Sequence, residues 1–362
     1  MHSFTVAGHQ ETSFLTWFMN NIREKFTEKG YRYLQEPEDN IRIVFNLLDR
    51  QKPRPFRRKA QATFVVSIIE EHEKPEDIFK AAYPYLIRSL ANHLIYVLHH
   101  DDHVEFYFIT PEQGFYKIRY DGDDESFFQK VFERLEPVAS SELVINNEFY
   151  DDLDQSLWNG NIHTEKIYHS GRKLNEMNLL PAPFPLEEYL TPRDMRQLKR
   201  LYGIGGLSYG NLSSRDDNES HFWMSASGVD KGNMRNVGQD ILYITGFNRD
   251  KNAMEIRVPP EITPKRASVD AIEHWMIYKE YPDVGAIVHI HAWMDGVQAT
   301  EINYPCGTIQ LAKAVADLVR SSEDPSRAVI GLKNHGLTIT GRDLDDIFER
   351  IDGKVVNQVP MT

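Results

Sequence analysis

The strongest chemical signal in the sequence is a pair of histidines, His289 and His291, separated by one isoleucine. On a β-strand, residues i and i+2 point to the same face, so both imidazoles would project together. Two imidazoles held close together do not readily carry a charge each, and a divalent metal ion is a common way to hold them. Histidines at this spacing also line polar cores and interfaces, so the pair alone leaves both interpretations open.

A third histidine, His335, follows the apolar run AVIGL and directly precedes Gly336. A histidine at the end of a strand, beside a glycine that lets the backbone turn sharply, is well placed to face a cleft. Taken alone, such a histidine would more simply hydrogen-bond a nearby carbonyl group.

Asp270, Glu273 and His274 share one face of a predicted helix, because they lie at positions i, i+3 and i+4. Asp270 is the candidate fourth metal ligand or general base, since a nearby cation would keep its carboxylate ionised. Glu273 and His274 are more typical of a solvated or interface pair.

Small polar segments could hold the anionic end of a substrate. They offer hydroxyls, an amide and accessible backbone N–H groups, which suit phosphate or carboxylate, above all at a helix N-terminus. Each segment by itself is typical of a plain turn. The segments are GNLSSR (210–215), SASG (225–228) and Ser268. The nearby GIGGLSYG (203–210) is not a dinucleotide-binding fingerprint, because it lacks the third glycine and no strand clearly precedes it.

Regular elements must position these residues. Apolar, β-branched runs predict four strands and helical periodicity predicts three helices, an α/β texture that begins near residue 191. The strands are expected over 221–226, 240–245, 284–292 and 327–334, and the helices over 191–202, 269–280 and 308–320.

The first 140 residues predict a smaller mixed α/β domain without a catalytic motif. Helices are expected over 12–28, 74–90 and 126–135, strands over 41–48 and 62–69, and a hairpin over 103–121. The basic cluster KPRPFRRK (52–59) is interpreted as a solvated loop rather than an anion site. Residues 141–185 carry prolines at 181, 183 and 185 and little periodicity, which predicts a linker before a second domain over 186–362.

Composition limits the class of protein. A chain of 362 residues fits about two domains, and a single cysteine, Cys306, excludes an internal disulfide. The formal net charge of −13 has the wrong sign for nucleic-acid binding. The first residues do not resemble a signal peptide, and no apolar run approaches the ~20 residues of a membrane span. We expect a soluble, cytoplasmic protein with neither nucleic-acid nor membrane partners.

The order of the segments GNLSSR, SASG, SVDAIEH, VHIHA and KNHG resembles the class II aldolase/adducin superfamily, which includes L-fuculose-phosphate aldolase and L-ribulose-phosphate 4-epimerase. The resemblance covers about 186–362 and leaves 1–150 unmatched. It implies an α/β/α domain with a central sheet, a divalent ion, usually zinc, on three histidines, and a homotetramer with sites between subunits. The matching residues are His289, His291 and His335 for the metal, Asp270 rather than Glu273 for the carboxylate, and Ser208, Asn211, Ser227, Gly228 and Ser268 for the phosphate pocket.

Three departures from the family pattern indicate an altered sugar-phosphate site. Val269 replaces the second of two hydroxyl residues before the carboxylate. The connection from His291 to the helix at 308 is short, and Tyr304 within it does not clearly match the family's aromatic acid/base. The C-terminus lacks the tyrosine-bearing tail of the aldolase.

These observations predict a metal-dependent lyase that cleaves a C–C bond in a small hydroxy-carbonyl substrate through a metal-stabilised enediolate. A decarboxylase, a dehydratase or an iron-dependent oxygenase on the same scaffold is the alternative, since three histidines also suit Fe(II) or Mn(II). A non-catalytic, adducin-like assembly module is the third hypothesis. The three histidines count against it, because adducin-type domains are expected to lose them.

Overall fold

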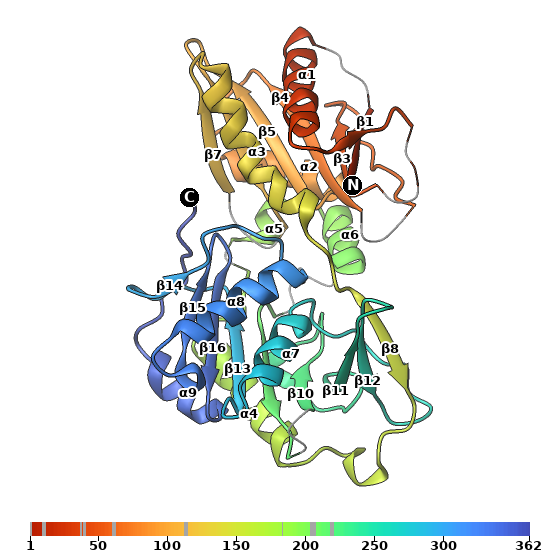
Figure 1. Cartoon of the computed structure of the whole chain (residues 1–362), viewed down its shortest axis with the longest axis vertical. Coiled ribbons are helices and arrows are strands. Elements are labelled where there is room, and N and C mark those ends of the chain that lie inside the picture. Colours follow the sequence, from red (N-terminus) through yellow and green to blue (C-terminus); the bar gives the residue numbers. More distant parts are fainter. Residues whose placement is uncertain are drawn as a thin grey trace. The chain divides into compact units, whose positions relative to one another are not determined.

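The structure is a computed structural model that describes residues 2–8, 12–36, 38, 41–59, 63–111, 115–182, 184–202, 208–217 and 221–362. Its contacts divide the chain into two compact units. The first contains Met1–Ser140, Phe184–Arg200 and Met361–Thr362, and the second contains Ser141–Pro183 and Leu201–Pro360. Both units combine helices with one sheet (Figure 1), which confirms the predicted mixed α/β class.

The sheet of the first unit has the order β2-β1-β3-β4-β5-β6-β7 in the described residues. Strands β1 to β5 pair in parallel, and β5, β6 and β7 continue as an antiparallel meander that contains the predicted hairpin. The strands are β1 (Ser3–Gly8), β2 (Arg32–Tyr33), β3 (Ile43–Leu47), β4 (Phe64–Glu71), β5 (His93–His99), β6 (Val104–Ile109) and β7 (Phe115–Tyr120). Residue 62 of the predicted strand and residues 112–114 of the hairpin lie outside the described residues.

Helices of the first unit pack through aromatic side chains. Trp17 of α1 (Ser13–Glu28) meets Phe128 of α3 (Asp124–Ser140), with ring centres 5.1 Å apart. Helix α2 (Ile78–Arg88) begins later than predicted, because Asp77 caps it by accepting a hydrogen bond from the Lys80 N–H.

The second unit is built on a sheet with the order β14-β15-β16-β13-β9-β10-β11-β12-β8 in the described residues. All neighbours are antiparallel except β8 with β12 and β14 with β15. The strands are β8 (Asn146–Tyr150), β9 (Asn211–Arg215), β10 (Phe222–Ser225), β11 (Ile241–Asn248), β12 (Ala253–Arg257), β13 (Ala286–Ile290), β14 (Gln298–Ala299), β15 (Val329–Leu332) and β16 (Gly336–Gly341).

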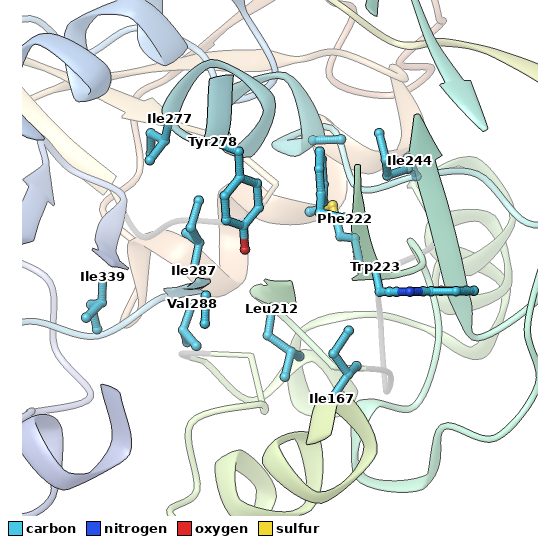
Figure 2. Close-up of a cluster of buried hydrophobic side chains, with 14 of the residues drawn as sticks. Ile167, Leu212, Phe222, Trp223, Ile244, Ile277, Tyr278, Ile287, Val288 and Ile339 are labelled. Carbon is cyan, nitrogen blue, oxygen red and sulfur yellow. The ribbon is translucent and has the colours of Figure 1, made fainter. Parts of the chain in front are cut away.

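Helices cover both faces of this sheet. Helices α4 (Ile162–Glu176) and α9 (Leu344–Ile351) contact one face and each other, and α7 (Ala271–Glu280) packs with α8 (Ile309–Ser321) on the other. Figure 2 shows apolar side chains on both sides of the central strands, with Leu212 toward Ile167 of α4 and Ile287 toward Ile277 of α7. No helix in the described part of the chain is long and apolar enough to span a membrane.

The segment 141–185 is not the extended linker that its sequence predicts. Strand β8 adds to the sheet edge in parallel with β12, and α4 packs on β9 and β10. Helix α4 escapes a periodicity search because its buried face contains Thr164, Ser170 and Gly171 beside only two large apolar residues, Ile167 and Leu174.

The predicted start of the second domain at 186 also differs from the structure. Helices α5 (Leu186–Tyr189) and α6 (Pro192–Tyr202) belong by their contacts to the first unit as far as residue 200. Arg88 Nη2 of α2 lies 2.8 Å from Asp194 Oδ2 of α6, and Gln197 donates to the Ile87 carbonyl. Residues 203–207 of the glycine-rich segment lie outside the described residues.

Candidate metal centre

The three predicted histidines come together at one end of the central strands of the second unit. His289 lies in β13 and His291 one residue beyond it, while His335 lies in the turn between β15 and β16. Antiparallel pairing of β13 with β16, which places Ile290 opposite Leu337, brings the turn to the histidine pair. One ligand atom from each histidine lies within 4.8 Å of the others, and the ring centres are 4.8–5.2 Å apart.

The buried ring nitrogens of this cluster fit a divalent metal ion. His289 Nδ1 donates to the Leu337 carbonyl at 3.0 Å, so its Nε2 carries a lone pair, and that atom is buried without a protein partner. The Nδ1 atoms of His291 and His335 are also buried without partners. Burial holds the pKa of all three imidazoles below the usual range, and metal ligands must be neutral. Imidazoles on one tetrahedral ion, with nitrogens about 2.0–2.1 Å from it, have ring centres about 5 Å apart, as here.

The turn that carries His335 is built differently from the sequence interpretation. The left-handed residue is Asn334, with φ 57°, and not Gly336. Gly336 instead permits close approach of two strands, because a Cβ at this position would lie 2.2 Å from the Ile290 carbonyl oxygen. The glycine therefore fixes the distance between the strand of the histidine pair and the third histidine.

We expect Gly336→Ala to destabilise the protein by about 1–3 kcal/mol, because the added methyl group must push β16 away from β13. The same displacement should move His335 and weaken metal binding. Gly232→Ala is the matched control, since its nearest new contact would be the Asp230 side chain at 3.2 Å. Equal thermal stability and equal metal affinity in the two variants would contradict this role.

Asp270 lies beside the three histidines. One of its carboxylate oxygens accepts a hydrogen bond, and the other has no protein partner. Asp270 is the residue before α7, and its side chain does not cap the helix. Asn211 Nδ2 donates to Asp270 Oδ2 at 2.8 Å and to Ser268 Oγ at 3.0 Å. Asp270 Oδ1 is buried without a protein partner. Because Asp270 is not in the group whose ligand atoms gather within 4.8 Å, its geometry suits a proton acceptor better than a fourth ligand.

The small polar residues predicted to bind an anion lie around Asp270, but three of them already bond to protein groups. Asn211 holds the carboxylate, as described above, and Ser268 Oγ donates to Asp270 Oδ2 at 3.4 Å. Ser208 Oγ accepts from the Lys231 N–H at 2.8 Å. An isolated antiparallel bridge pairs Ala226 with Ala267, so Ser227 and Gly228 on one segment lie near Ser268 on the other. Gly228 has a left-handed backbone, with φ 66°.

Sequence reasoning missed Lys231, a buried lysine in the same site. Its side chain is only 2% exposed, and Nζ donates to the Ser208 carbonyl at 2.7 Å. Burial lowers its pKa to about 8, against the opposing charges of Asp270 and Asp230. Lys231 lies three residues after the SASG segment, which could have indicated that it belongs to the site. A lysine in a polar turn, however, is normally exposed.

Glu273 and His274 are buried rather than solvated, which corrects the interpretation of their sequence pattern. Thr338 Oγ1 donates to Glu273 Oε1 at 2.5 Å, and burial together with the charge of Asp270 raises the Glu273 pKa to about 8. His274 Nδ1 lies 2.8 Å from Ser213 Oγ, and burial lowers its pKa to about 3. Both residues support the sheet beneath the site.

Comparison with known proteins finds similarity to one family and to two relatives. Residues 195–294 match the class II aldolase and adducin N-terminal domain. The chain is 26% identical to L-fuculose phosphate aldolase of Methanocaldococcus jannaschii over 141 residues, covering 33% of this chain and 78% of that protein. It is 22% identical to methylthioribulose-1-phosphate dehydratase of Klebsiella pneumoniae over 175 residues, covering 40% of this chain and 79% of that protein.

Two solved structures are also similar to about half of the chain. YgbL of Klebsiella pneumoniae has 17% identity and a TM-score of 0.34, over 52% of this chain and 82% of that one. An aldolase II superfamily protein of Pseudomonas syringae has 16% identity and a TM-score of 0.35, over 52% of this chain and 69% of that one. The family match confirms the resemblance found in the sequence.

Proposed function

Because the chain carries a class II aldolase and adducin N-terminal domain over residues 195–294, we propose that it is a divalent-metal-dependent lyase. The proposed reaction is cleavage of a C–C bond in a small hydroxy-carbonyl substrate. One observation carries the proposal: three buried imidazole nitrogens without protein partners converge beside the unpartnered Asp270 Oδ1. Both curated relatives are named as enzymes, an aldolase and a dehydratase, which supports catalysis over a purely structural role.

In this proposal His289, His291 and His335 hold the ion. A bound divalent ion supplies Lewis-acid stabilisation of the negative charge that develops on a carbonyl oxygen. Asp270 Oδ1 accepts the proton of the substrate hydroxyl, while the amide of Asn211 fixes the other carboxylate oxygen. The ammonium group of Lys231 adds a buried positive charge that favours an anionic substrate. Ser227, Gly228 and Ser268 would contact the anionic group of that substrate.

Dehydration is the second candidate reaction, and the dehydratase relative favours it. In an aldolase on this site Asp270 would accept the hydroxyl proton while the C–C bond breaks. In a dehydratase it would accept the proton of the carbon next to the carbonyl, and the C–O bond then breaks as the hydroxyl leaves as water. Zinc as the metal and a homotetramer are further parts of the proposal that rest on the family resemblance. A cytoplasmic location is a further part that rests on the composition and the sequence features described above.

Proton exchange in D₂O tests the proposal without knowledge of the full substrate. Small hydroxy-carbonyl compounds, with and without a phosphate group, are incubated with zinc-loaded protein, and NMR follows deuterium entering the carbon next to the carbonyl. We expect exchange of at least one compound that chelation of the metal abolishes. Absence of metal-dependent exchange across such a set, together with absence of C–C or C–O cleavage, would contradict a lyase.

The position of Val269 leads to a prediction about how the protein binds the anionic group of its substrate. The Val269 side chain is 36% exposed at the position where a second hydroxyl would help to bind phosphate. We expect Val269→Ser to raise kcat/KM for phosphorylated substrates by about tenfold, the equivalent of about 1.4 kcal/mol from one added hydrogen bond. Unphosphorylated compounds serve as the internal control. An equal change for both classes would contradict the assignment of Val269 to the anion pocket.

A further inference from the structure

The first unit carries a second group of potential metal ligands at the end of its parallel strands. Strand β4 ends at Glu70 and Glu71 and is followed by His72, and β5 ends at His99. The parallel register pairs Glu70 with Val97 and Glu71 with Leu98, so the next step along both strands brings His72 beside His99. Open α/β sheets bind ligands at the carboxyl ends of their strands, which is where these residues lie.

Distances between the three side chains are those of a site that can close on an ion. Glu70 Oε1 lies 2.6 Å from His99 Nε2 and 3.8 Å from His72 Nε2. The two imidazole rings stack with centres 4.5 Å apart, and ligand atoms of all three residues lie within 4.8 Å of one another. Ligand atoms on a tetrahedral ion about 2.0–2.1 Å away are about 3.3 Å apart, so small side-chain movements bring both distances to that value.

A partly buried hydrogen bond orients the carboxylate toward the histidines. Thr12 Oγ accepts the Leu15 N–H at 3.1 Å, as the cap of α1, and donates its proton to Glu70 Oε2 at 2.5 Å. Glu70 is only 7% exposed, and its ion-pair partners in the described residues are the two histidines. Its neighbour Glu71 pairs instead with Arg50. A carboxylate held by a hydroxyl on one oxygen and facing two imidazoles with the other has the outer support typical of metal ligands.

A neighbouring cluster with similar composition lacks this property. His100, His103 and Glu105 also lie within ligand distance of one another. There, Lys117 Nζ donates to Glu105 Oε1 and Tyr107 OH donates to Oε2, both at 2.5 Å. The Lys117 ammonium group already neutralises the Glu105 carboxylate and lies where a metal ion would otherwise bind. This cluster is therefore a control for the metal-binding test.

We propose that Glu70, His72 and His99 bind a divalent transition-metal ion, zinc in the first place, at a site separate from the histidines of the second unit. Two imidazoles and one carboxylate suit zinc and its neighbours, whereas magnesium and calcium prefer all-oxygen sites. Three protein ligands leave a coordination position open, and the His72 side chain, 59% exposed, places that position next to solvent.

The test counts zinc bound by the full-length, tag-free chain after removal of metal and titration with Zn²⁺ alone. We expect two high-affinity ions per chain in the native protein and one in Glu70→Gln. We also expect one in His335→Ala, and none in the double variant. His72→Ala should weaken the first-unit site at least tenfold without loss of folding, because this side chain is largely exposed. Glu105→Gln is the matched control and should retain two ions.

Different results separate this inference from the proposed function. A native count of one that falls to zero in His335→Ala would overturn the first-unit site and leave the second-unit site standing. Two ions retained in both Glu70→Gln and His72→Ala, each folded by circular dichroism, would overturn it as well. Loss of an ion in Glu105→Gln but not in Glu70→Gln would place the ion at the neighbouring cluster and contradict the assignment.

Discussion

Replacing His289, His291 or His335 by alanine is expected to remove one bound zinc ion per chain and to abolish metal-dependent turnover. Each variant keeps only two of the three imidazole ligands of the tetrahedral site, so its affinity for zinc should fall by several orders of magnitude. Each variant should remain folded, and the rise in melting temperature that zinc gives the native protein should become smaller, because binding to the folded state is lost. Metal analysis and thermal melts with and without zinc measure both effects.

His169→Ala is the control for this series, since His169 is an exposed histidine of α4 away from the cluster. It should retain the native metal content. A polar core lined by histidines, the alternative considered from the sequence, predicts the reverse pattern for the three variants. Stability without metal would then fall strongly, and metal content would be the same as in the control.

Asp270→Asn is expected to slow proton exchange and cleavage by about 10²–10⁴-fold, the contribution typical of a general base. The amide keeps the shape of the side chain but cannot accept the proton at Oδ1. Metal content should remain native, because the three histidines hold the ion without this carboxylate. The measurement is kcat/KM in the exchange assay, paired with a zinc count on the same preparation.

Glu273→Gln is the matched control for Asp270→Asn. Glu273 lies three residues later on the same helix face, but its raised pKa, about 8, keeps it largely protonated at pH 7, and glutamine imitates that form. We expect its activity to stay within tenfold of the native value. A large loss in Glu273→Gln with little loss in Asp270→Asn would show that the wrong carboxylate has been assigned.

That the three histidines come together could be predicted, because strand geometry places them. Alternation along a strand places His289 and His291 on one face, and His335 stands directly before the strand that pairs with theirs. Asp270 required more, because helix periodicity could not separate it from Glu273. The family resemblance favoured Asp270, and the tertiary contacts also separate the two residues: Asn211 holds Asp270 in the site, while Thr338 holds Glu273 under the sheet.

Strand β9 shows why the rest could not be predicted. Its sequence, NLSSR, has the residues of a turn, yet it is buried in the middle of the sheet between β13 and β10. Long-range partners satisfy its polar groups. Ser213 bonds His274 and Tyr278, and the Arg215 guanidinium donates to backbone carbonyls such as that of Val284. Strand propensity contains no information about such partners, which come from segments more than sixty residues away.

The same limit applies to Lys231 and to helix α4. The lysine is buried because α4 packs directly on its backbone, where a Cβ on Gly171 would lie 2.0 Å from the Lys231 carbonyl oxygen. The small residues that permit this contact are those that weaken the apolar periodicity of α4. The close packing of α4 on Lys231 therefore explains why neither the helix nor the buried lysine was predicted from the sequence.

X-ray diffraction at the zinc absorption edge, on crystals of the zinc-loaded full-length protein, locates the bound ion itself. We expect an anomalous peak in the second unit about 2.0–2.1 Å from one nitrogen of each of His289, His291 and His335. For His289 that nitrogen is Nε2, because Nδ1 is already bonded to the Leu337 carbonyl. A zinc-loaded crystal without a peak among these three rings, or with His289 bound through Nδ1, would contradict the proposed zinc site.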